Sequence, residues 1–183
     1  MVQIPTGLFL LLSVVTATSA IPTKRTVAQV EADIADIVTQ VDALDSSINA
    51  FPATGGSLLA ALAIHSSATT LISTLQTATT DTTATDAFSE DDGATILASV
   101  EAFEPTILDA LTAIVAKEPA FEALPIGGIP ALVLQDLQGL NSATGAFSDA
   151  LIAKSPADLV DQADEIKTTI GNGFDTAIAA YSN

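Results

Sequence analysis

Apolar side chains recur every three or four positions through most of this chain. The first run starts at Val27 and ends at Phe51, with intervals that alternate between three and four. This spacing places the apolar residues on one face of an α-helix of about seven turns. Similar runs follow in 57–78, 96–114, 133–151 and 159–181, and no segment alternates as a β-strand would. The sequence therefore predicts an all-α fold, an antiparallel bundle of about five amphipathic helices.

Capping and breaking residues set the expected helix boundaries. The stretch 77–86 is rich in Thr and poor in apolar bulk, which predicts a frayed helix end and a linker. Ser89 is placed to cap the third helix, and Pro105 inside it predicts a kink or a split into two. Ser155 and Asp158 form a capping-box pattern that predicts the start of the fifth helix.

The amino-terminal segment has the features of a secretory signal peptide. Residues 1–20 contain an apolar run and end in small residues, and that run is too short to cross a bilayer. Lys24 and Arg25 then form a dibasic pair of the kind that processing proteases cut, so 21–25 is a candidate propeptide. We expect one helical-bundle domain in 26–183, secreted and either extracellular or loosely associated with a cell wall.

The charge balance excludes several classes of partner. The formal net charge is -17, which would repel nucleic acid and anionic membranes. The uncharged stretch 46–80 is interrupted by Pro52 and many Ser and Thr residues, so we expect no transmembrane segment. The chain has no cysteine, so a secreted form must be stabilised by burial without disulfides.

The residue inventory speaks against catalysis. With a single histidine and no cysteine, the chain cannot assemble a metal site of the His/Cys type. No GxSxG turn accompanies His65, and we expect no catalytic site and no cofactor. His65, Thr69 and Thr144 are instead polar residues at predicted core positions, where a hydrogen-bonded structural role is the plain interpretation. If the bundle encloses a fatty acid, the same three residues are candidate anchors for its carboxylate.

One loop is unusually apolar. The sequence ALPIGGIPALV joins the third and fourth helical runs and contributes five candidate residues of a hydrophobic patch or lid: Leu124, Ile126, Ile129, Leu132 and Val133. One interpretation is that these residues cover the end of the bundle, with Pro130 starting the next helix. The alternative is that they contact hydrophobic material outside the protein.

The last third of the sequence resembles a known family. The residues Leu137, Leu140, Thr144 and Phe147, the LIAKSP turn, and Ile166, Phe174, Ala177, Ile178 and Tyr181 resemble the hydrophobic surface-binding protein A family of secreted fungal proteins, which includes cell-wall galactomannoproteins. The resemblance implies an all-α fold and adsorption to hydrophobic surfaces or lipids, with recruitment of a secreted esterase. It equally implies, as alternatives, a fatty-acid carrier with a cavity inside the bundle or a structural cell-wall mannoprotein.

Overall fold

Five long helices make up the protein. The computed structural model describes residues 25–182, so the predicted signal peptide and the first four residues of the candidate propeptide lie outside the described part. Within 25–182 there is no β-strand, and the predicted all-α bundle is confirmed. The helices are α1 (Val27–Ala50), α2 (Leu58–Ala84), α3 (Glu90–Glu122), α4 (Ile129–Ile152) and α5 (Val160–Tyr181).

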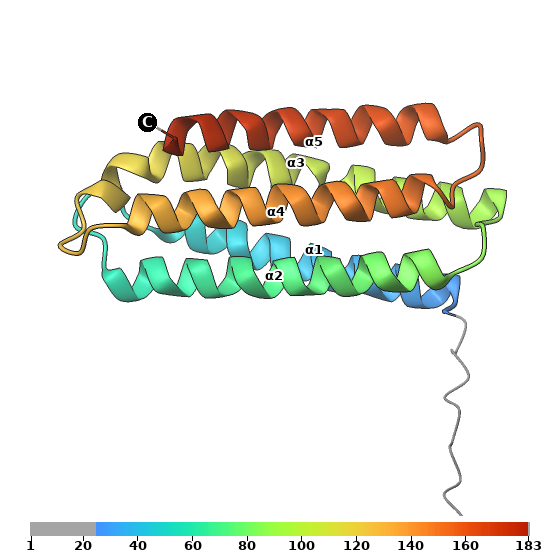
Figure 1. Cartoon of the computed structure of the whole chain (residues 1–183), viewed down its shortest axis with the longest axis horizontal. Coiled ribbons are helices and arrows are strands. Elements are labelled where there is room, and N and C mark those ends of the chain that lie inside the picture. The colour runs from blue at the N-terminus through green and yellow to red at the C-terminus, as the bar shows by residue number, and fades with distance from the viewer. Residues whose placement is uncertain (1–24, 183) are drawn as a thin grey trace, which may run out of the picture.

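The helices form a closed ring rather than two flat layers. Successive helices run in opposite directions along the same long axis (Figure 1). In space, the contacts follow the order α1, α2, α4, α5, α3 and back to α1, and α3 approaches α4 across the ring over a shorter stretch. Each helix turns its apolar face toward the interior. Because five helices surround a wider axis than four do, the packing of this interior decides what the protein can enclose.

α2 is longer than the sequence pattern predicts. The stretch 77–86, expected to be a linker, is helical as far as Ala84. Ala78 and Thr82 are fully buried there, so small side chains supply the packing that large apolar residues supply elsewhere. The Thr79 hydroxyl donates to the Leu75 carbonyl one turn earlier, at 2.7 Å, and other threonines repeat this bond. A Thr-rich sequence can therefore remain helical when tertiary contacts favour it.

α3 runs without a break through Pro105. Proline removes the hydrogen bond to the carbonyl four residues earlier, which is that of Glu101. Glu101 and Pro105 are both exposed, so water can satisfy this carbonyl and no split follows. At the amino end of α3, the Ser89 side chain accepts from the Asp92 N–H at 3.2 Å, as the capping pattern predicts.

The predicted capping box at the start of α5 is wrong. Ser155 closes α4 instead, since its hydroxyl donates to the Leu151 carbonyl at 2.9 Å. A turn follows in which the Leu159 N–H donates to the Pro156 carbonyl at 3.1 Å, and α5 begins at Val160 without a side-chain cap. The SPAD pattern was compatible with both ends of a tight helix connection, and the turn geometry decided between them.

Aromatic side chains close one end of the ring. Phe51, just after α1, stacks on Phe121 near the end of α3, with ring centroids 4.4 Å apart. Gly56 leaves room for this pair, because a Cβ atom there would lie 2.3 Å from Cζ of Phe51. The ammonium group of Lys117 also donates to the Phe51 carbonyl. These contacts join the α1–α2 connection to the carboxyl end of α3.

α2 alone among the described helices is long and apolar enough to cross a membrane, judged by length and composition. In the bundle, however, its inner face packs against the other helices. Its buried apolar residues are Ala61, Ile64, Ala68, Leu71, Leu75 and Ala78. Such a helix is also what the wall of an apolar core requires.

Candidate functional site

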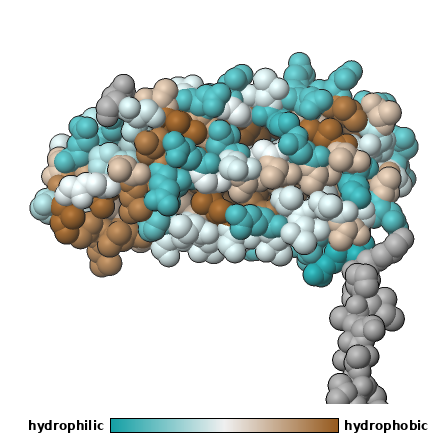
Figure 2. Space-filling view, in the orientation of Figure 1, coloured by the Kyte–Doolittle hydropathy of each residue, from teal (hydrophilic) through white to brown (hydrophobic). Residues whose placement is uncertain are grey.

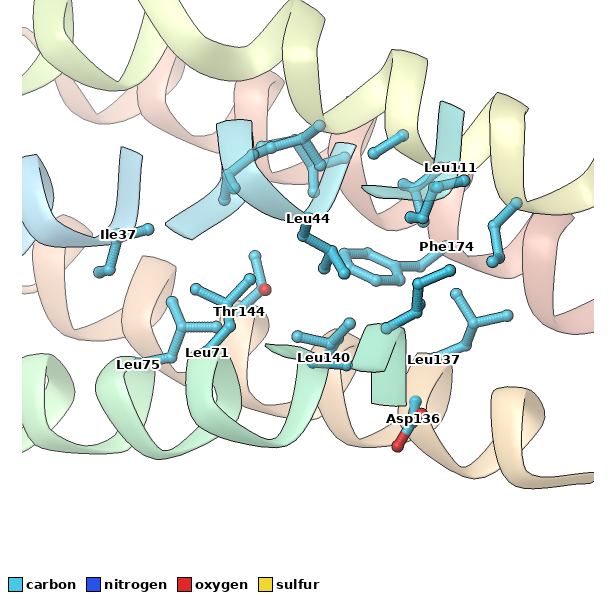
Figure 3. Close-up of a pocket in the computed structure, with 18 of the residues that line it drawn as sticks. Ile37, Leu44, Leu71, Leu75, Leu111, Asp136, Leu137, Leu140, Thr144 and Phe174 are labelled. Carbon is cyan, nitrogen blue, oxygen red and sulfur yellow. The ribbon is translucent and has the colours of Figure 1, made fainter. Parts of the chain in front are cut away.

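The ring of helices encloses an elongated apolar cavity. Its volume is about 110 Å³, and all five helices contribute to its wall (Figure 3). On α4 the lining residues extend from Ile129 to Leu151, a distance of roughly 33 Å at 1.5 Å per residue. α1, α3 and α5 contribute only apolar side chains, and residues labelled in Figure 3 include Ile37, Leu44, Leu71, Leu75, Leu111, Leu137, Leu140 and Phe174.

The cavity is narrow for its length. Ligand sites for drug-sized molecules usually have volumes of roughly 300 to 1,000 Å³, so this one is partly collapsed. An apolar cavity of this kind stays dry rather than filling with water. A thin, flexible apolar chain could enter by displacing side chains, whereas a rigid ring system would need a wider space. Ala61, Ala68 and Ala110 keep part of the wall low.

Two charged side chains interrupt the apolar wall. His65 of α2 and Asp136 of α4 both line the cavity, and the histidine Nδ1 lies 2.9 Å from each carboxylate oxygen of Asp136. The Asp136 side chain is 10% exposed and that of His65 is 32% exposed. Burial raises the pKa of Asp136, and the hydrogen bond and charge of His65 oppose that rise. The pair therefore joins the cavity to the outside along the α2–α4 seam.

Sequence reasoning picked out His65 but missed Asp136. The four-residue spacing of Leu132, Asp136, Leu140 and Thr144 places this acid in an inward-facing row of α4. All four residues line the cavity. An acid within such a row was the signal that the chain carried, and it was hidden among many solvent-facing acids.

The two candidate threonines lie in different places. Thr144 lines the cavity, where Figure 3 places it among Leu44, Leu71 and Leu140, and its hydroxyl has no hydrogen-bond partner within residues 25–182. Thr69 is exposed on α2, and its hydroxyl donates to the Ser66 carbonyl at 2.9 Å. It does not line the cavity, so the structure joins His65 with Thr144 and leaves Thr69 outside.

The apolar loop is divided between the interior and the surface. Leu124, Ile129 and Val133 are buried, and Ile129, Leu132 and Val133 line the cavity. These residues occupy the positions that the interpretation as an end cover requires. Ile126 points outward and is 53% exposed.

Ile126 belongs to an exposed apolar surface that the sequence pattern did not reveal. Leu59 and Leu62 on the first turns of α2 are 80% and 42% exposed. The start of α2 and the α3–α4 loop lie at the same end of the bundle, where apolar surface gathers (Figures 1 and 2). We call Leu59, Leu62 and Ile126 the end patch. Sequence reasoning had assigned Leu62 to the buried row, and the helix end leaves it only partly covered.

An all-α ring around an elongated apolar cavity defines a class of small binding protein built to enclose a chain-like apolar molecule. The family model "Hydrophobic surface binding protein A" matches residues 27–153. The chain belongs to this family, as the resemblance predicted. No match was found among curated proteins.

Solved structures share the fold over most of the chain. A crystal structure of Afmp4p in complex with palmitic acid is 33% identical, covers 85% of this chain and 99% of its own, and superposes with a TM-score of 0.79. Ligand binding domain 1 of the Penicillium marneffei MP1 protein, complexed with arachidonic acids, is 17% identical with a TM-score of 0.77, covering 86% of this chain and 99% of its own. Domain 2 of the same protein, with multiple arachidonic acids, is 18% identical with a TM-score of 0.77 and covers 88% of this chain and 99% of its own.

Proposed function

We propose that this chain is a secreted, non-catalytic lipid-binding protein that holds a fatty acid or a similar single-chain amphiphile along the axis of its helix ring. The observation that carries the proposal is the elongated cavity, whose wall is apolar on all five helices and polar only near His65, Asp136, Thr144 and Ser148. An acyl tail matches the long apolar part, and its head group matches the polar part. The similarity to a palmitic acid complex at 33% identity supports the same ligand class.

The thermodynamics favour a long chain over a short one. Each buried methylene contributes about 0.8 kcal/mol, which is about fourfold in affinity. A single chain also displaces no ordered water from a dry cavity. The proposal therefore requires an affinity that grows with chain length until the cavity is full.

A chain-length series tests this requirement. We expect the dissociation constants of saturated fatty acids, measured by displacement of a fluorescent fatty acid below the aggregation limit, to fall by up to about fourfold per added methylene. The fall should stop at the length that fills the ring. Affinity that is independent of chain length, or no displacement at all, would show that the cavity is not the binding site.

The end patch favours a second function, adsorption to hydrophobic surfaces. Three exposed large apolar residues at one end give a contact surface outside the cavity. Transfer of three such side chains from water contributes on the order of 3 to 5 kcal/mol, allowing for their partial exposure. The net charge of -17 keeps molecules apart in solution, and salt should strengthen adsorption by screening this repulsion. Recruitment of a secreted esterase and a structural role in a cell wall remain predictions from the resemblance.

Replacing the end patch tests adsorption separately from lipid uptake. The triple variant Leu59→Ser, Leu62→Ser and Ile126→Ser should lower partitioning onto alkyl-coated beads by about 100-fold, because the contact free energy is lost. Its affinity for a soluble fatty acid should stay within about twofold, since none of the three residues lines the cavity. Undiminished adsorption would place the contact surface elsewhere.

A further inference from the structure

The buried carboxylate of Asp136 poses a problem for a fatty acid. A fatty acid is itself a carboxylate at neutral pH, and the polar part of the cavity already holds one. Asp136 is 8% exposed, and both of its oxygens lie 2.9 Å from the single nitrogen Nδ1 of His65. The protein has therefore used its cavity histidine on its own acid.

No other charge in the cavity compensates for a second carboxylate. Within residues 25–182, His65 and Asp136 are the two titratable side chains that line the cavity. α2 contributes His65 and α4 contributes Asp136, while the lining residues of α1, α3 and α5 are all apolar. Lys117, Lys154 and Lys167 are engaged outside the cavity, with backbone carbonyls or with Asp149. Two carboxylates that share such a site do not both ionise.

From this arrangement we infer that His65 and Asp136 form the head-group site and that they select a head group without charge: a fatty alcohol, or a fatty acid that carries its proton. This inference rests on the proposed function and specifies its ligand. An uncharged hydroxyl donates its hydrogen to a carboxylate oxygen of Asp136, which retains lone pairs beyond its contact with His65. The tail then lies along the apolar wall from this point.

The consequence for a fatty acid is that binding takes up one proton. The proton resides on the ligand or on Asp136, and the pair of carboxyl groups shares it. Burial raises the pKa of Asp136, which favours retention of this proton. The free ligand loses its proton as the pH rises above the pKa of its carboxyl group, whereas the bound form keeps it. Affinity for a fatty acid must therefore fall by about tenfold for each pH unit in that range.

A matched pair of ligands tests the inference on the intact protein. We expect decanol to bind with an affinity that changes by less than about threefold between pH 5 and pH 8, because it has no titrating group in this range. Decanoic acid should bind with an affinity that falls by about tenfold per pH unit. Calorimetry in buffers of different ionisation enthalpy should show an uptake of about one proton for the acid and none for the alcohol.

Substitution of the acid supplies the second arm. Asp136→Asn keeps the shape and removes the charge, so decanoic acid should bind at least tenfold more tightly than to the unaltered protein at pH 8 and with a flatter pH dependence. Asp149→Asn, on the exposed face of the same helix, should leave both unchanged. If Asp136→Asn does not fold, the comparison of the two ligands on the unaltered protein still decides.

The outcomes separate the two proposals. Binding of decanoic acid at equal strength at pH 5 and pH 8, or a pH dependence that survives in Asp136→Asn, overturns the head-group inference and leaves lipid binding intact. Failure of both ligands, and of longer homologues, to bind at any pH overturns the proposed function and the inference with it.

Discussion

Replacing Ala68 with leucine should weaken the binding of a fatty acid by between about tenfold and a hundredfold. Ala68 is buried on α2 and lines the cavity, so three additional carbon atoms would occupy space that the acyl chain needs. The ligand would lose contacts equivalent to two or three methylenes at about 0.8 kcal/mol each. Fluorescence displacement with a long-chain fatty acid measures this loss.

The same substitution should leave the fold at least as stable. Filling an apolar cavity commonly contributes about 0.5 to 2 kcal/mol to the free energy of unfolding, provided that the new side chain finds a relaxed rotamer. Ala63→Leu is the matched control, since it makes the same change on the exposed face of the same helix. Tighter stability together with weaker binding, at Ala68 alone, is the expected signature. Equal binding by both variants would mean that the ligand lies outside the ring.

Phe121→Ala should lower the free energy of unfolding by about 3 to 5 kcal/mol. Phe121 is 1% exposed and stacks on Phe51, so its removal leaves a cavity and also breaks an aromatic pair. Because this pair closes one end of the ring, the loss falls where the two connections meet. Urea denaturation, followed by the helical circular dichroism signal, gives the change directly.

Phe121→Leu is the control for this prediction. Leucine keeps most of the buried volume and loses the ring stacking, so its cost should be well below that of alanine, at about 1.5 kcal/mol. A cost below about 1 kcal/mol for Phe121→Ala would show that the end of the ring is not held by these rings.

The periodicity of apolar residues predicted the fold because the helices of a bundle bury one face each. In α1 the predicted stripe contains Val30, Ile34, Ile37, Val41, Leu44 and Ile48, and all six are buried. The same reasoning failed at the end of α2, where Thr82 is buried although its polarity suggested a linker. Helical threonines bond to their own backbone, and such local bonds leave no trace in an apolar pattern.

The candidate site could be predicted only in part. His65 and Thr144 line the cavity as their inward spacing suggested, but the same spacing placed Thr69 inside, and it lies at the surface. A helical row gives an angle around the axis to within one residue, which cannot distinguish a cavity wall from a helix seam. Asp136 was overlooked because its partner is 71 positions away in the sequence. Only the contact between α2 and α4 identifies it as part of the site.

The mass of the secreted protein tests the central claim most directly. Native mass spectrometry of the chain purified from culture medium, before and after extraction with organic solvent, would reveal any lipid that it carries. We predict a bound species of a few hundred daltons that is lost on extraction and replaced, at one or a few molecules per chain, when fatty acid or fatty alcohol is added back. A protein that carries no lipid when secreted, and that takes up none after extraction, would contradict the assignment of the cavity as a lipid site.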